Sequence, residues 1–148
     1  MLNQSNQSNL WLNLSKIMKN KNWLITAFLL CGLAVILGAF GAHGLKRLVS
    51  PLQIETFKTG VQYHFYHAIA IALAVIVSQF ADSQQLRRAM RLFMGGIVLF
   101  SGSLYGLTFA EVANTEGVRW LGAVTPIGGV LFISGWLNLA MAVYKIEK

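Results

Sequence analysis

The sequence predicts an all-α membrane protein: a bundle of four transmembrane helices with a short surface helix between the first and the second. Composition is the first reason, since 55% of the 148 residues are apolar and 11% are charged, whereas a typical soluble domain has roughly 25% charged residues. The second reason is that the chain contains four uncharged stretches of 18 to 24 residues. The third is that the net charge of +7 gathers in short basic clusters between these stretches, as in the loops of membrane proteins.

The four stretches cover residues 23–42, 63–80, 92–110 and 121–144. Roughly 20 residues at about 1.5 Å each cross a hydrocarbon core of about 30 Å, so each stretch is long enough to span. The membrane interior admits only helices or closed barrels, and residues 97–100, Ile-Val-Leu-Phe, lack the alternation of a barrel strand. We therefore expect residues 23–144 to form a single helical membrane domain. Pro126 lies close to the start of the last helix or kinks it.

The connection between the first two stretches carries the signal for a helix start. Ser50 can cap a helix, Pro51 suits its first position, and Gln53 completes a capping box. An apolar stripe then continues toward the second stretch through Ile54, Phe57, Val61 and Phe65. This pattern predicts a surface helix that bends near Gly60, where the chain turns into the membrane. We expect headgroup depth for the polar residues that open the second stretch: Gln62, Tyr63, His64, Tyr66 and His67.

Basic residues beside the spans predict the orientation, because they concentrate on the cytoplasmic side. One side has eight of them: Lys16, Lys19, Lys21, Arg87, Arg88, Arg91, Lys145 and Lys148. The other side has four: Lys46, Arg47, Lys58 and Arg119. Both termini, including a short tail at residues 145–148, are therefore expected in the cytoplasm.

Residues 1–22 form an N-terminal extension, predicted to be cytoplasmic and partly disordered. Residues 1–9 are almost all Asn, Gln and Ser, a composition that cannot pack a core. Apolar residues then recur at helical spacing, which predicts a short helix lying on the inner leaflet: Leu10, Trp11, Leu14, Ile17 and Met18. The sequence leaves open whether translation starts at Met1 or at Met18. The first apolar run is longer than the roughly 7 to 15 residues of a secretory signal core, so a retained helix is favoured.

Small residues at intervals of four predict where the helices touch. The ridge on the first helix comprises Ala34, Gly38 and Ala42, that on the third comprises Gly102, Gly106 and Ala110, and the fourth helix offers Thr125 and Gly129. Close backbone approach of this kind drives helix association in lipid. Asn138, the amide in the middle of the last stretch, should face a neighbouring helix. The alternative is that the glycines line a narrow path through the bundle.

Several polar residues fall together on the outer side of this topology. His43 ends the first stretch, and we expect it to form a hydrogen-bonded interface cluster with Tyr63, His67 and Glu111, since amphipathic side chains anchor helix ends there. His43, His64 and His67 are the candidates for metal ligands. No HExxH or CxxC motif supports a metal site. The sequence therefore predicts no metal, no cofactor and no catalytic residue.

Four ordered motifs resemble a known family. They are Gly38-Ala39-Phe40-Gly41-Ala42-His43-Gly44-Leu45, residues 55–63 leading to Tyr66-His67-Ala68, residues 100–105, and residues 125–129 ahead of Gly135-Trp136. They look like the domain-of-unknown-function family 423, the YgdD/YwdK-like small inner-membrane proteins of bacteria. The resemblance covers about Trp23 to Tyr144. It implies a four-helix protein of the bacterial inner (plasma) membrane, and it brings no established activity, cofactor or catalytic residue.

No reaction follows from these residues, so we rank classes of function. The first class is a structural or accessory membrane protein that binds partners. The second is a small transporter or channel, alone or as an oligomer, and the third is an enzyme. A transporter usually carries charged residues at mid-membrane, and the four stretches hold none. The expected partners are the lipid bilayer, a second copy or other membrane proteins. Nucleic acid is not expected, because the basic residues do not form a continuous face.

Overall fold

The computed structural model describes residues 3–80, 84–115, 117–118 and 120–145, without the side chains of residues 5, 8 and 10–19. The sequence-based expectations for Arg119 and Lys148 lie outside the described residues. The described chain is helical and contains no strand. Its elements are α1 (Gln4–His43), η1 (Leu45–Arg47), α2 (Pro51–Val77), α3 (Gln84–Gly96), η2 (Ile97–Ser101), α4 (Gly102–Val112) and α5 (Leu121–Tyr144).

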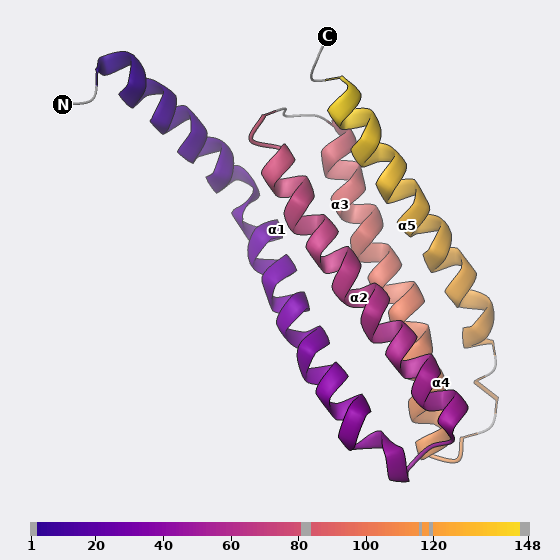
Figure 1. Cartoon of the computed structure of the whole chain (residues 1–148). Helices are drawn as coiled ribbons and strands as arrows, with labels where there is room; N and C mark the ends of the chain where they lie inside the picture. The colour runs from indigo at the N-terminus through magenta and orange to yellow at the C-terminus, as the bar shows by residue number, and fades with distance from the viewer. Residues whose placement is uncertain (1–2, 81–83, 116, 119, 146–148) are drawn as a thin grey trace.

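Four helices of the described chain are long and apolar enough to cross a membrane. They run over Asn20–Arg47, Pro51–Val77, Gln84–Val112 and Leu121–Tyr144, the third being α3, η2 and α4 in one continuous helix. Figure 1 shows successive helices running side by side in opposite directions, with the N and C termini at the same end of the bundle. The predicted class, an all-α membrane protein with four spanning helices, is confirmed.

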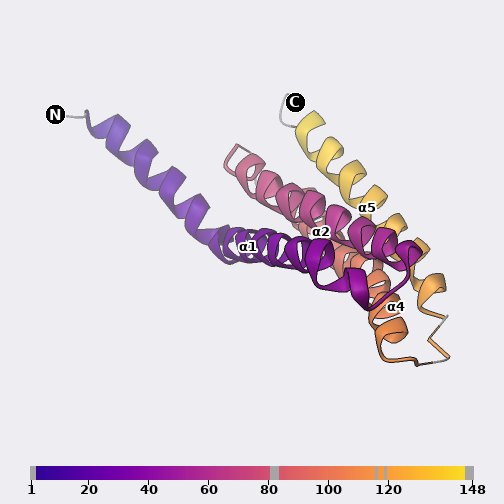
Figure 2. The ribbon, with the colours of Figure 1, turned by 60° about the horizontal axis from the view of Figure 1, so that its bottom comes forward.

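The N-terminal part of α1 differs from its prediction. Helix α1 begins at Gln4 and continues without interruption into the first span, whereas we expected a separate short helix before it; the partial disorder of this extension stays a prediction. Extending an existing helix adds one hydrogen bond per residue fixed and avoids the cost of a new nucleus. The polar segment therefore continues the helix that the apolar run has already formed. It projects beyond the bundle, away from the other helices (Figures 1 and 2).

The start of α2 agrees with the prediction, but its course does not. Ser50 caps the helix by accepting a hydrogen bond from the backbone N–H of Gln53 at 3.4 Å, and Pro51 occupies the first turn. The surface helix expected from Pro51 is not separate from the second span, because α2 is unbroken through Gly60. A Cβ on Gly60 would come within 2.9 Å of the Tyr105 ring. The glycine thus serves a close approach to α4 and not a bend.

Helix α2 lies at the centre of the packing, since it contacts α1, α3, η2 and α4, while α5 covers α3, η2 and α4. Helix α1 packs along α2 and makes no comparable contact with the later helices of the described chain. Its fully covered positions recur every seven residues at Ala27, Ala34 and Gly41, the repeat of a narrow seam. At the far end of that seam the Asn20 side chain donates to Ser78 Oγ at 2.9 Å.

The predicted packing residues occupy different environments. Ala34 is 1% exposed, and a Cβ on Gly38 would meet Val61 at the ordinary distance of 3.5 Å. A Cβ added to Gly106 would lie 2.8 Å from the Leu121 side chain. A Cβ added to Gly129 would lie 3.9 Å from the Phe100 ring. Ala42 is half-buried.

Gly102 does not lie at a helix contact, contrary to prediction, because it is exposed with nothing within 4 Å of an added Cβ. The tightest contacts belong to other glycines. Phe100 packs on Gly128 and Phe93 packs on Gly135, while Phe132 packs in return on Gly96. The rings of Phe93 and Phe132 therefore fill positions where the facing helix has no side chain, and at Gly128 helix α5 lies directly against the Phe100 backbone.

Candidate functional site

The expected interface cluster of His43, Tyr63, His67 and Glu111 is not found as a unit. His43 is exposed at the end of α1, and Glu111 binds the start of α2, accepting from the Ser50 backbone N–H at 2.6 Å. His67 lies sixteen residues beyond Pro51 on α2, about 24 Å along the axis at about 1.5 Å per residue. Only Tyr63 and His67 are brought together. His64 and His67 of α2 face the bundle interior and are buried, whereas Gln62, Tyr63 and Tyr66 are exposed on its flank.

His67 is held on both ring nitrogens. Nδ1 lies 2.8 Å from the carbonyl oxygen of Tyr63, and Nε2 lies 3.2 Å from Trp136 Nε1. Because a carbonyl only accepts and an indole N–H only donates, Nδ1 carries the proton and Nε2 accepts. The ring also stacks on Phe132 with centroids 3.4 Å apart. His67 thus joins α2 to α5 as a fully bonded neutral imidazole.

His64, the second buried histidine, has one nitrogen without a partner. It is 2% exposed, and its Nδ1 lies 3.2 Å from Tyr105 Oη. Its Nε2 has no hydrogen-bond partner, and the same holds for the buried Ser101 Oγ on η2. The three candidate metal ligands His43, His64 and His67 occupy different positions, and the described residues contain no group of three His, Cys, Asp or Glu side chains that could hold a metal ion.

Asn138 has an intrahelical partner. Its Nδ2 donates to the Ser134 carbonyl oxygen, one turn earlier on α5, at 2.8 Å. The side chain is half-buried. The amide therefore satisfies one of its hydrogen bonds within its own helix. An interhelical polar contact of α5 lies toward the other end of this helix, where Ser103 Oγ of α4 is 2.7 Å from Thr125 Oγ1.

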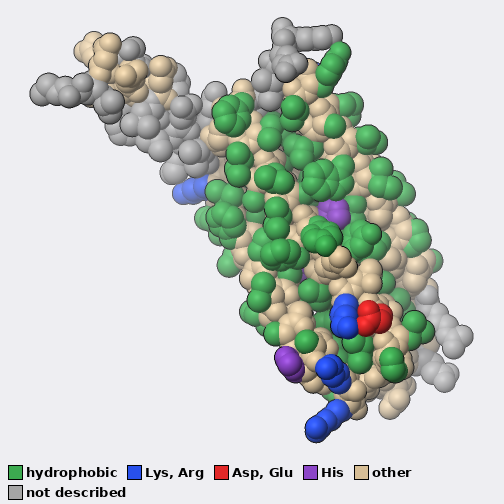
Figure 3. All heavy atoms as spheres, in the orientation of Figure 1, with side chains coloured by type: hydrophobic (Ala, Val, Ile, Leu, Met, Phe, Trp, Pro, Cys, Tyr) green, Lys and Arg blue, Asp and Glu red, His purple; other side chains and the backbone are tan. Residues whose placement is uncertain are grey.

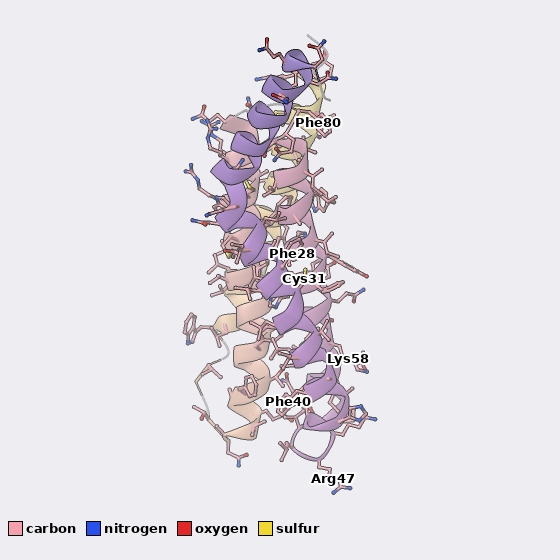
Figure 4. The ribbon with its side chains drawn as sticks, turned by 90° about the vertical axis from the view of Figure 1, so that its left-hand side faces the viewer. Phe28, Cys31, Phe40, Arg47, Lys58 and Phe80 are labelled. Carbon is pink, nitrogen blue, oxygen red and sulfur yellow. The ribbon has the colours of Figure 1, made fainter. Side chains whose placement is uncertain are left out.

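A row of exposed polar side chains follows one face of α2, and we call it the α2 polar stripe. It consists of Glu55, Lys58, Thr59, Gln62 and Tyr66, all of which are exposed. Lys58 pairs with Glu55 at 2.7 Å, and Gln62 Nε2 donates to Tyr66 Oη at 2.8 Å. Figure 3 shows an adjacent basic and acidic side chain on an otherwise largely hydrophobic face of the bundle. Figure 4 places Lys58 between Arg47 and Cys31 along the bundle.

The stripe enters the apolar part of the bundle. Gly38 faces Val61, the residue before Gln62, and Gly38 lies four residues inside the uncharged run that ends at Ala42. At about 1.5 Å per residue, the Gln62 backbone is therefore about 6 Å inside the apolar end of α1, and Tyr66 is one turn deeper. Sequence reasoning missed this site because average hydropathy does not show which face of a helix carries its polar residues.

A shallow groove of about 310 Å³ runs beside the inner half of the stripe, between α1 and α2. The small residues Ala34 and Gly38 line it, and Gln62 and Tyr66 contribute apolar atoms to its almost wholly apolar lining, with their polar groups at its edge. Small residues and hydrogen-bonding side chains are the two features that bring transmembrane helices together. The arrangement is thus that of one half of a helix–helix contact.

Comparison with known proteins supports the membrane assignment. The family model described as "Protein of unknown function (DUF423)" matches residues 37–129. The UPF0382 membrane protein of Haemophilus influenzae is 43% identical over 129 residues, which cover 86% of this chain and 98% of that protein. The UPF0382 membrane protein YwdK of Bacillus subtilis is 42% identical over 114 residues, which cover 76% of this chain and 88% of YwdK. No solved structure matches the chain significantly.

Proposed function

This chain belongs to the DUF423 family, whose members compared above are small membrane proteins, and from that premise we propose an accessory function: it binds a transmembrane helix of a partner protein along the α2 polar stripe. The observation that supports this proposal is the exposure of Gln62 and Tyr66 inside the apolar zone. Polar side chains in membrane helices almost always face protein or water. Within the described chain nothing covers this pair.

The remaining hydrogen-bonding capacity of the pair defines the partner. Gln62 donates one amide hydrogen to Tyr66 Oη, which leaves its other amide hydrogen, its carbonyl oxygen and the Tyr66 hydroxyl hydrogen. A helix seated in the groove on Ala34 and Gly38 would approach closely and bring a Ser, Thr, Asn or Gln side chain to this depth. Interhelical hydrogen bonds of this type contribute about 0.6 to 1.7 kcal/mol.

Site-specific photocrosslinking in native membranes tests the proposal. A photoreactive phenylalanine analogue replaces Tyr66, and the same analogue replaces Ile76, which is 53% exposed on the same face beyond the stripe. We expect a discrete protein adduct from position 66 and none from position 76. A Gln62→Leu background should reduce the adduct about 3- to 15-fold, the equivalent of one interhelical hydrogen bond. Sequencing of the adduct should identify a transmembrane segment with a hydrogen-bonding side chain.

Three outcomes would overturn the proposal. Position 66 could label lipid only, or the adduct could survive Gln62→Leu unchanged in a variant with the original thermal stability. An adduct with a second copy of this chain would replace the accessory function by self-association. Position 76 controls for chance labelling, because its side chain is as exposed as Tyr66 and lies on the same helix.

A second candidate function, a small transporter or channel, has one observation in its favour. The bundle interior contains polar groups without protein partners, His64 Nε2 and Ser101 Oγ, and such groups mark substrate and ion pathways in membrane proteins. Flux into proteoliposomes separates this function from the accessory one. Transport of a solute by the purified chain alone would favour the second candidate.

We also propose that the membrane is the bacterial inner (plasma) membrane and that both termini are cytoplasmic. The termini lie at the same end of the bundle (Figure 1). The basic residues Lys21, Arg88, Arg91 and Lys145 flank the helices at that end and are exposed. The positive-inside rule then assigns that end to the cytoplasm.

A further inference from the structure

Two buried polar atoms without protein partners lie on facing helices in the middle of the bundle. Ser101 is 0% exposed and His64 is 2% exposed, and neither Ser101 Oγ nor His64 Nε2 has a hydrogen-bond partner. Leaving a buried donor or acceptor unpaired costs about 1 to 3 kcal/mol each. A fold that buries both at once calls for a group that satisfies them.

Helix register places these two residues opposite each other. Gly60 of α2 faces Tyr105 of α4, and the two helices run antiparallel (Figure 1). One turn further along α2 is His64, and one turn back from Tyr105 is Ser101. The hydrogen bond between His64 Nδ1 and Tyr105 Oη, at 3.2 Å, fixes the imidazole on this side of α2.

The backbone beside this pair is unusual. Residues 97–101 form η2, a π-helical segment that ends at Ser101. Such segments are rare and are often found at functional sites. On its other side η2 is tightly packed, since Gly128 of α5 lies against Phe100. Ser101, the last residue of this irregular segment, is therefore the one that stands at the level of His64 in the helix register.

We propose that His64, Ser101 and Tyr105 form a binding site for one buried water molecule between α2 and the third spanning helix. Water both donates and accepts, so one molecule can satisfy the imidazole nitrogen and the serine hydroxyl together. Tyr105 Oη has His64 as its hydrogen-bond partner. If the phenol donates to Nδ1, the ring proton lies on Nε2 and the water accepts it.

The site has a chemical consequence beyond packing. Tyr105, His64, the water and Ser101 would form one continuous hydrogen-bonded chain that links α2 to the third spanning helix. This inference is independent of the partner helix proposed above. The α2 polar stripe lies on the opposite face of the same helix.

Nuclear magnetic resonance of the full chain in lipid nanodiscs, labelled with ¹⁵N-histidine, tests the site. We expect a cross-peak between the His64 ring and water protons. His67 is the internal control, because it is buried on the same helix and its ring nitrogens are occupied by Tyr63 and Trp136. A His64 ring that contacts water no more than the His67 ring does would overturn the proposal.

Two serine variants sharpen the test. Ser101→Ala should remove most of the His64–water cross-peak and lower the melting temperature, since the water loses one of its partners. Ser103→Ala is the matched control: Ser103 is bonded to the Phe100 carbonyl and to Thr125, so this variant should leave the cross-peak intact. In a dry site Ser101→Ala would only delete an unpaired hydroxyl, and an unchanged or higher melting temperature would refute the water site.

Discussion

Replacement of Gly128 by alanine tests whether α5 and η2 touch through their backbones. An ideal Cβ at this position would lie 2.7 Å from the Phe100 Cβ and 2.8 Å from its Cα. Non-bonded carbon atoms prefer about 3.5 to 4.0 Å, so the contact is about 1 Å too short. Backbone atoms cannot rotate away as a flexible side chain can. Helix α5 must therefore move off η2 to admit one methyl group.

The expected size of the effect is the difference of two terms. Overpacking of this kind costs about 1 to 3 kcal/mol, and Gly→Ala inside a helix returns up to about 1 kcal/mol. We expect the free energy of unfolding to fall by up to about 2 kcal/mol in Gly128→Ala. Gly102→Ala is the matched control, because nothing lies within 4 Å of its added Cβ. The Gly102→Ala variant has the gain in helix propensity without a clash on the facing helix, so it should be neutral or stabilising.

Thermal unfolding of the two variants and the original chain, in the same detergent and lipid mixture, measures the effect. The expected order of melting temperatures is Gly128→Ala lowest, and Gly102→Ala equal to or above the original. A Gly128→Ala protein as stable as the Gly102→Ala protein would show that the two backbones are not in contact. The close packing of α5 on η2 described above would then be wrong.

Three further predictions concern other parts of the chain. Glu111→Ala should lower stability by about 0.5 to 2 kcal/mol, because the carboxylate accepts from the Ser50 N–H, whereas Glu111→Gln should be milder; equal losses would contradict the acceptor role. His67→Leu should lower the free energy of unfolding by about 1 to 3 kcal/mol, because it leaves the Trp136 N–H unpaired. In the Trp136→Phe background most of that loss should vanish. Added zinc should not change the melting temperature of the original chain. A reporter active only in the periplasm, fused after Lys148, should stay silent, and activity would reverse the orientation.

Sequence patterns predicted the parts of this fold that depend on length and on local chemistry. The lengths of the four apolar runs were enough to predict the four spanning helices, because the thickness of the bilayer sets the minimum length of such a helix. The helix start at Ser50 followed from capping chemistry, which involves only neighbouring residues. The continuity of α2 through Gly60 depends instead on Tyr105, and no local pattern contains that contact.

The spacing of small residues identified ridges but not their partners. Gly102 and Gly128 are both glycines at helical spacing, yet one faces open space and the other meets Phe100. The difference lies in what the facing helix places opposite each glycine: the Phe100 backbone lies against Gly128, and nothing lies against Gly102. Spacing along one helix cannot show this, because it depends on the register between the two helices.

The sequence predicts headgroup depth for the polar residues of α2 from their low average hydropathy, but the helix separates these residues by face. His64 and His67 point inward and are buried, whereas Gln62 and Tyr66 point outward and are exposed. Successive residues of a helix are about 100° apart, so positions 62 and 64 face nearly opposite directions. The two sets therefore share no partner, and mutational effects at sites without shared partners add. Gln62→Leu should weaken partner binding without altering the His64–water cross-peak. Ser101→Ala should weaken the His64–water cross-peak without altering partner binding. Each proposal can thus fail while the other stands.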